Sequence, residues 1–245
     1  MRLATATFAS AVAVAMLAGC HVDVPGMQHR TKQYSVGQVR VLAVTAHVGD
    51  VQLTGGDSAQ VTVTERISFR HTAPVTSHRV SGGTLTLDSH CPDGGACGVD
   101  YQITLPRSLT VRVTDNVGSI RLRSLSGPVT AHTNAGSINL ESLSGPVTAT
   151  GHVGSVNGQQ LSCRQATLRS SVGAVQATFT SAPASVTAAT GVGTVTLRLP
   201  AAAHYAVTAH ANIGKTRVSV TRSSSSSHRV MASTKTGSVT VEPVP

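Results

Sequence analysis

The sequence has very few aromatic residues. Tryptophan is absent, and phenylalanine and tyrosine occur 3 times each in 245 residues. Proteins that bind single-stranded nucleic acid stack its bases on aromatic side chains, and many lectins hold sugar rings in the same way. The scarcity therefore argues against a nucleic-acid partner and against a lectin site that stacks sugars.

Acidic residues are also scarce. The chain has 10 of them, and the stretch from Arg107 to Val241 contains only Asp115 and Glu141. Glycosidases need two carboxylates that face each other across the scissile bond, and these two do not obviously converge. Signature motifs of serine hydrolases, zinc proteases, P-loop proteins and dinucleotide-binding proteins are missing too. We therefore expect no enzyme, no catalytic residue, no metal and no cofactor.

What the chain does contain is an internal repeat with a period of 18 residues. Val117-Gly118-Ser119-Ile120 returns as Ala135-Gly136-Ser137-Ile138, and 125–131 returns as 143–149. A fixed period of this size is typical of stacked supersecondary units. The repeated glycine recurs, with intervals of 18 to 23 residues from its second occurrence onward, at Gly49, Gly118, Gly136, Gly154, Gly173, Gly193, Gly214 and Gly237.

Apolar and polar side chains alternate on both sides of each repeated glycine. Val, Ile or Leu commonly stand two and four residues after it, and Val or Ala five and seven residues before it. A period of two is typical of half-buried strands, and glycine allows a sharp corner between them. We predict an all-β fold: a β-solenoid, similar to a parallel β-helix, whose two-strand coils of about 18–23 residues stack about 4.8 Å apart.

The first coil is predicted to begin at Gln38, with Gly49 at its corner. The residues that follow, to Leu105, do not keep the 18-residue interval. We predict that they form a hairpin-rich section that covers one end of the solenoid, because an exposed ladder edge would recruit other chains. The segment Val230–Val241 is predicted to be the last coil. No second domain is needed, so residues 38–243 form one strand-repeat domain.

The N-terminus has the pattern of a secretory signal. A single charge, Arg2, precedes an apolar run that is too short to span a membrane and ends in small residues. Residues 17–20, Leu-Ala-Gly-Cys, resemble a bacterial lipobox, which implies that residues 1–19 are removed and that Cys20 is acylated, with fatty acids such as palmitate. The alternative is an ordinary cleaved signal with a chance cysteine. Residues 20–37 show no periodicity and are predicted to be a tether.

Three cysteines remain after Cys20. Cys91 and Cys97 enclose a glycine-rich loop, and in an exported protein we expect them to form a disulfide. A zinc site there would need more ligands, and only His90 is close in sequence. Cys163 is left over.

Positive charge concentrates on the repeated part of the chain. From residue 107 to 241 there are 12 lysines and arginines against two acidic residues, a net charge of +10. The alternation places four arginines on the outward face of the strand that follows the glycine, where they are candidates for contact with an anionic envelope polymer. The alternative is a basic but merely solvated surface. The four are Arg121, Arg123, Arg198 and Arg217.

The repeats have a resemblance to a known group of proteins. Residues 101–106 (Tyr-Gln-Ile-Thr-Leu-Pro), residues 109–113 and the repeated G-[ST]-[IV]-x-L steps resemble bacterial β-strand-repeat proteins of unknown function, often labelled putative adhesins. The similarity covers roughly residues 38–241. It implies a noncatalytic surface protein and transfers no site residues. Some members of that family are linked to envelope-stress signalling.

We therefore expect an extracytoplasmic, membrane-anchored lipoprotein of a bacterial envelope that offers a repetitive β surface for binding or scaffolding. Its partners would be the membrane, through the lipid, and an anionic envelope polymer or another envelope protein. Two alternatives stay open. A sensor in envelope-stress signalling would show partner-dependent effects without polymer binding, and a degenerate polysaccharide-active β-helix enzyme would need a cleft with converging carboxylates.

Overall fold

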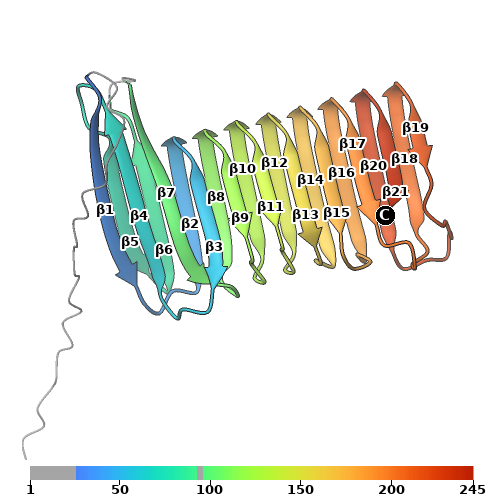
Figure 1. Ribbon diagram of the computed structural model, residues 1–245, viewed down its shortest axis with the longest axis horizontal. Coiled ribbons are helices and arrows are strands. Elements are labelled where there is room, and N and C mark those ends of the chain that lie inside the picture. The colour runs from blue at the N-terminus through green and yellow to red at the C-terminus, as the bar shows by residue number, and fades with distance from the viewer. Residues whose placement is uncertain (1–25, 93–95, 245) are drawn as a thin grey trace, which may run out of the picture.

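The chain folds into two large β-sheets that face each other across a continuous apolar core (Figure 1). The computed structural model describes residues 26–92 and 96–244, and within them there are 21 strands and no helix, so the all-β prediction is confirmed. None of these residues belongs to a helix long and apolar enough to cross a membrane.

One sheet has 11 strands and the other has 10. In spatial order, the 11-stranded sheet consists of β1 (Gln28–Val36), β4 (Val61–Phe69), β7 (Cys97–Pro106), β3 (Val51–Gly56), β9 (Ile120–Arg123), β11 (Ile138–Glu141), β13 (Val156–Leu161), β15 (Val175–Phe179), β17 (Val195–Leu199), β21 (Val239–Pro243) and β19 (Thr216–Val218). The 10-stranded sheet consists of β18 (Ala206–Ile213), β20 (Arg229–Thr236), β16 (Ser185–Val192), β14 (Gln165–Val172), β12 (Val147–Val153), β10 (Val129–Ala135), β8 (Thr110–Val117), β2 (Val41–Val48), β6 (Thr84–His90) and β5 (Val75–Ser81).

Each sequence repeat contributes one strand to each sheet. From β8 to β17, successive strands alternate between the sheets, and each pairs in parallel with the strand one repeat away. The register follows the sequence repeat, since Val129 pairs with Val147 and Ile120 with Ile138. These four residues are buried and their neighbours along each strand are more exposed, so the alternation of buried and exposed side chains is confirmed.

The repeated glycines form the corner between the two sheets. Gly136 has a φ of 144°, and a Cβ atom there would lie only 1.9 Å from the carbonyl oxygen of Gly118 in the neighbouring repeat. Only glycine combines this backbone conformation with such a close approach. The corner therefore accounts for the strict recurrence of glycine in the sequence.

The N-terminal section joins the same two sheets and makes them mixed. Strand β1 pairs antiparallel with β4, which pairs antiparallel with β7, and β5 pairs antiparallel with β6. The tether predicted over residues 20–37 is wrong for Gln28–Val36, because this segment is an edge strand whose residues face mostly solvent and so lack a clear apolar pattern. The predicted signal and Cys20 lie outside the described residues.

Strands β20 and β21 do not end the stack. They lie between β16–β17 and β18–β19 in both sheets, so the prediction that Val230–Val241 is the last coil is wrong. A physical reason lies two residues after the glycine, where β21 has the inward Val239 and β19 has Thr216. Covering Val239 on both sides buries more apolar surface than covering a threonine would. The inward apolar residues of β20 and β21 are fully buried, whereas those of β18 and β19 are only partly buried: Val230, Ala232, Val239 and Val241 against Val207, Ala209, Ala211 and Val218.

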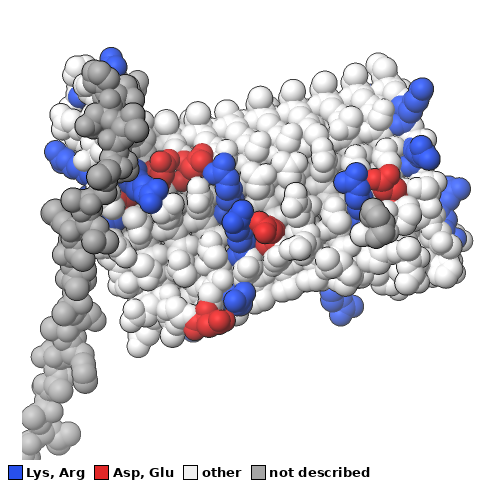
Figure 2. Space-filling model, in the orientation of Figure 1, with Lys and Arg blue, Asp and Glu red and all other residues white. Residues whose placement is uncertain are grey.

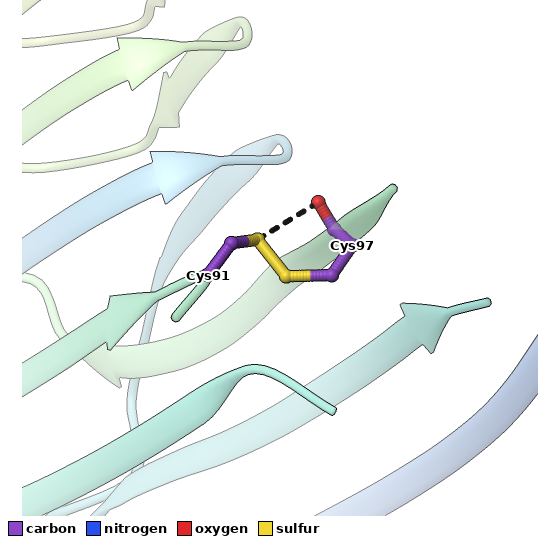
Figure 3. Close-up of a disulfide and its surroundings, with 2 residues drawn as sticks. All are labelled: Cys91 and Cys97. Atoms are coloured by element: carbon purple, nitrogen blue, oxygen red, sulfur yellow. Dashed lines mark hydrogen bonds between the residues drawn. A yellow bond between two sulfur atoms is a disulfide. The ribbon is translucent and has the colours of Figure 1, made fainter. Parts of the chain in front are cut away.

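A disulfide joins Cys91, just after β6, to Cys97 at the start of β7 (Figure 3). It thus ties together the two strands of one N-terminal coil, which lie in different sheets. Cys163 is a free, fully buried cysteine, and burial raises the pKa of its thiol to about 11.

The alternation can be tested with two neighbouring substitutions on β12. Val147 is buried between the sheets and Thr148 is exposed. Val147→Asp should lower the free energy of unfolding by about 3 kcal/mol or more, because it buries an unpaired charge. Thr148→Asp, the matched control, should cost no more than about 1 kcal/mol. Equal losses in denaturant unfolding would contradict the assignment of the two faces.

A candidate polar binding surface

The four predicted arginines do lie on the outer face of one sheet. Arg121 and Arg123 belong to β9, Arg198 to β17 and Arg217 to β19, all in the 11-stranded sheet. Strands β11, β13 and β15 separate the first pair from Arg198, a distance of about 19 Å at about 4.8 Å per strand. The arginines therefore form separate groups rather than one continuous row.

Three of the four arginines have an acidic partner. Arg121 Nη1 lies 2.8 Å from Asp50 Oδ2. Arg123 Nε lies 2.9 Å from Glu141 Oε2, and Arg198 Nε lies 2.9 Å from Glu242 Oε1. Arg217 has no ion pair with any described residue. These ion pairs neutralise part of the positive charge on this face, and Figure 2 shows basic side chains with acidic ones beside them.

Two of these acids were missed for different reasons. Asp50 is 71 residues from Arg121 in the sequence, and the two meet only because β3 pairs directly with β9 across the non-repeating section. Glu242 stands five residues after its glycine, as Arg198 does after its own. The two side chains are neighbours only because β21 pairs with β17.

A hollow of about 380 Å³ lies on the outer face of β9, β11 and β13. Two rows of outward side chains line it, with one residue from each strand in each row. The row three residues after the glycine consists of Arg121, Asn139 and Asn157, and the row five residues after it consists of Arg123, Glu141 and Gln159.

The hollow is rich in hydrogen-bonding groups. Asn157 donates an N–H to the side-chain oxygen of Asn139 at 3.1 Å, which orders the two amides. Each amide keeps further donors and acceptors, and each arginine has five N–H groups, of which its ion pair uses only a part. The arrangement can therefore bind a ligand that carries both hydroxyls and anionic groups.

The two acidic residues considered for catalysis do not converge. Asp115 is fully buried in β8, whereas Glu141 faces solvent from β11 in the other sheet. They cannot flank a glycosidic bond. In the described part of the chain, no group of three or more His, Cys, Asp or Glu side chains is placed to hold a metal ion.

Asp115 occupies a position that other repeats fill with a hydroxyl. Three residues before the glycine, buried Ser or Thr side chains donate to the carbonyl oxygen of the glycine in the neighbouring coil, as Ser170 does to Gly154 at 2.7 Å. Both carboxyl oxygens of Asp115 are buried, and neither has a hydrogen bond of good geometry to a described residue. The equivalent hydroxyls are those of Thr133, Ser170, Thr190 and Thr234.

Burial, together with the smaller effect of the negative charge of Asp50, raises the pKa of the Asp115 carboxyl to about 7. The backbone N–H groups of Asn116 and Val117 oppose this shift only in part. The neutral acid is therefore favoured in the folded protein well above the pH at which an ordinary aspartate ionises. A protonated carboxyl could donate a hydrogen bond as the hydroxyls of this column do.

The raised pKa of Asp115 predicts that the folded protein loses stability as the pH rises. Below about pH 3.8, Asp115 is protonated in both the folded and the unfolded protein. As the pH rises from there toward 7, Asp115 ionises in the unfolded chain only, so the free energy of unfolding falls. Above about pH 7 it ionises in both states, and the free energy of unfolding levels off. Asp115→Ser should remove this loss and stabilise the protein at pH 8 by up to about 4 kcal/mol, with little gain at pH 4.

Chemical unfolding at both pH values measures the difference. Asp57→Ser, at a side chain that is 92% exposed, is the control and should change little at either pH. A gain from Asp115→Ser that is the same at both pH values would contradict the raised pKa.

Comparison with known proteins gives a match in fold alone. No known sequence family matches the chain, and no curated protein matches its sequence. Among solved structures, a protein of Bacteroides fragilis described as a putative adhesin has a TM-score of 0.53 at 16% identity, covering 89% of this chain and 97% of that one.

Two further structures are less similar in shape. A putative cell adhesion protein of Clostridium sporogenes has a TM-score of 0.38 at 12% identity, covering 89% of this chain and all 100% of the other. A putative lipid binding protein of Parabacteroides distasonis has a TM-score of 0.43 at 11% identity, covering 89% and 97%. Of the three, the Bacteroides fragilis protein is the one whose similarity shows a shared fold.

Proposed function

We propose that this chain is a noncatalytic, lipid-anchored protein of a bacterial cell envelope, whose repeats form a β-solenoid that binds an anionic envelope polymer. The observation that carries the proposal is the polar hollow on β9, β11 and β13. It combines two arginines with the hydrogen-bonded amides of Asn139 and Asn157 on the outer face of three neighbouring parallel strands.

The chemistry of the hollow suits a charged, hydroxylated polymer. Guanidinium groups recognise carboxylates and phosphates, and side-chain amides bind hydroxyls. Because Asp50 and Glu141 already neutralise part of the local charge, binding would depend on directional hydrogen bonds as well as on attraction. This is a narrower site than the four-arginine face, and it includes Arg121 and Arg123 but not Arg198 or Arg217.

Two further observations support an adhesin-like role. Each repeat contributes one strand to each sheet, and this strand pairs in parallel with the strand of the next repeat, as a stacked solenoid requires. The Bacteroides fragilis protein with the same fold bears the name of a putative adhesin, which fits a noncatalytic surface protein.

The lipid anchor is proposed from residues 17–20, Leu-Ala-Gly-Cys. A cysteine that carries two or three acyl chains stays in a membrane, whereas one chain alone binds only weakly. Strand β1 follows this segment and lies at the edge of the 11-stranded sheet, so the anchor would hold the protein by that end.

The anchor is tested by Cys20→Ala. Without the thiol that accepts the lipid, the protein should leave the membrane fraction and appear in soluble or unprocessed form. Fractionation of intact cells, with metabolic labelling by a fatty acid, measures both effects. Cys163→Ala is the control and should leave location and labelling unchanged. A Cys20→Ala variant that stays labelled in the membrane would rule out this anchor.

The hollow is tested by Arg121→Gln combined with Arg123→Gln. Binding of the full chain, held in neutral detergent, to anionic wall polymer isolated from the host cell should weaken by about tenfold. It should also weaken in high salt, because the screening length falls from about 10 Å at 0.1 M to about 3 Å at 1 M.

The matched control is Arg112→Gln combined with Arg169→Gln, which removes the same charge from the outer face of the other sheet. It should bind almost as the natural chain does. If the control weakens binding equally, or if neither pair matters, the hollow is not the polymer site. Equal binding at low and high salt would also count against it.

A further inference from the structure

The end of the stack formed by β18 and β19 leaves both sheets open. Among the described strands, β18 pairs with β20 alone and β19 with β21 alone, so each is the last strand of its sheet. An edge strand carries backbone N–H and C=O groups that can pair with another chain. Here two such edges lie at the same end of the molecule (Figure 1).

The pairing of β18 shows which backbone groups are unused. Ala206 donates its N–H to His228 on the β20 side. Because the backbone groups of successive residues in a parallel strand point to alternate sides, those of Val207, Ala209 and Ala211 point to the open edge. An added strand would pair with these three residues.

The core is also incompletely covered at this end. Val207, Ala209, Ala211 and Val218 are only partly buried, whereas the equivalent side chains one coil further in are fully buried. A strand added to the edge could cover this apolar surface with its own inward side chains. A polar polymer could not do so.

The chain itself shows that this edge accepts a strand. The connection from β19 to β20 returns along the edge, where Tyr205 donates its N–H to Thr221 O and accepts the N–H of Ser223. This forms a parallel bridge between Tyr205 and Arg222. The pairing stops there, immediately before β18, and the rest of the edge is left uncovered.

Positive charge surrounds the open edge. Residues 206–242 carry five exposed lysines and arginines and one acidic residue, Glu242, which already pairs with Arg198. None of the five has an ion pair among the described residues. Figure 2 shows basic side chains along this end of the molecule. The five are Lys215, Arg217, Arg222, Arg229 and Lys235.

We propose that this end binds an extended acidic segment of a partner protein, which adds a parallel strand to β18 and extends the sheet. Its inward residues would be small and apolar, to cover Val207, Ala209 and Ala211, and its outward residues would be acidic, to meet the five cations. Addition of a strand to an open sheet edge is a recurrent mode of peptide recognition.

A second copy of the chain fits less well. At the opposite end, the edge strands β1 and β5 carry Arg30, Lys32 and Arg79 and no acidic residue, although Lys32 pairs with Glu65 of β4 at 4.0 Å. Association of copies end to end would therefore bring like charges together. The partly open apolar core likewise favours a peptide strand over an anionic polymer.

The test uses the full chain in neutral detergent and a short fluorescent peptide in which valine and aspartate alternate. Fluorescence anisotropy should show binding, and a peptide with lysine in place of aspartate should not bind. Methylation of every second backbone nitrogen of the peptide leaves its charge unchanged but blocks pairing, and it should weaken binding about tenfold or more.

Variants of the protein locate the site. Ala209→Pro should weaken binding to a similar extent yet preserve the fold, because proline is tolerated where the N–H points away from the sheet; Ala211→Pro serves the same purpose if that variant is unstable. Lys215→Glu with Arg217→Glu should also weaken binding. The matched control, Arg70→Glu with Arg79→Glu at the opposite end, should not.

Three results would overturn the proposal. The first is peptide binding that survives both backbone methylation and Ala209→Pro, or complete displacement of the peptide by inorganic polyphosphate. Either result would indicate electrostatic attraction without strand pairing. The second is an equal loss in the control variant. The third is self-association of the chain that Ala209→Pro abolishes. Arg121→Gln with Arg123→Gln should leave peptide binding unchanged, so the outcome is independent of the polymer site.

Discussion

The structure depends on the contact between glycine backbones at the corner of adjacent repeats. A Cβ atom on Gly136 would lie 1.9 Å from Gly118 O, and one on Gly154 would lie 1.9 Å from Gly136 O. These contacts fix how far apart the repeats are and which residues stand opposite each other. A slip by one residue would turn every apolar side chain outward and would also place a side chain against a carbonyl group. The register is therefore determined at the corner.

A fixed register turns each position of the repeat into a column. Inward columns of valine, leucine and alanine make the core, and the column three residues before the glycine carries the hydroxyls that bond to neighbouring glycine carbonyls. The column five residues after the glycine pairs Arg123 with Glu141 and Arg198 with Glu242. The same constraint produces the amide pair of Asn139 and Asn157 in the candidate site. Structure and surface chemistry thus follow from one contact.

The sequence could predict the columns but not the order of the coils. Period-two alternation and the recurring glycine identify which residues face the core, because both depend on neighbouring residues only. The choice of neighbour depends on small differences between similar coils. Val186 pairs with Val230 rather than with Val207, although all three are valines in the same column. The acidic partner of Arg198 could not be predicted for this reason, since Glu242 lies beside it only because β21 pairs with β17.

Asp115 and strand β1 were missed for a related reason. Asp115 follows the alternation, which makes it inward, but its charge suggests an exposed residue, and only the packed structure shows that it is buried in the hydroxyl column. Strand β1 lies at the edge of the 11-stranded sheet, and Tyr34 is its one buried residue. The Tyr34 ring stacks on His78 of β5, with 4.4 Å between the ring centroids. A strand that buries one residue leaves no periodic pattern.

The two ends of the stack are closed by different means, and this difference bears on function. At one end, antiparallel strands and the contact between Tyr34 and His78 join the two sheets. At the other end, a returning connection covers only the region around Tyr205 and Val220, and five cations discourage association of like molecules. Another strand can pair with the open edge at either end of a stack of similar coils, so both ends need a feature that prevents unwanted pairing. A charged, incompletely covered end excludes copies of itself but remains open to a strand of opposite charge. In the described part of the chain, this end combines unpaired strand edges, partly buried apolar side chains and unpaired cations in one place.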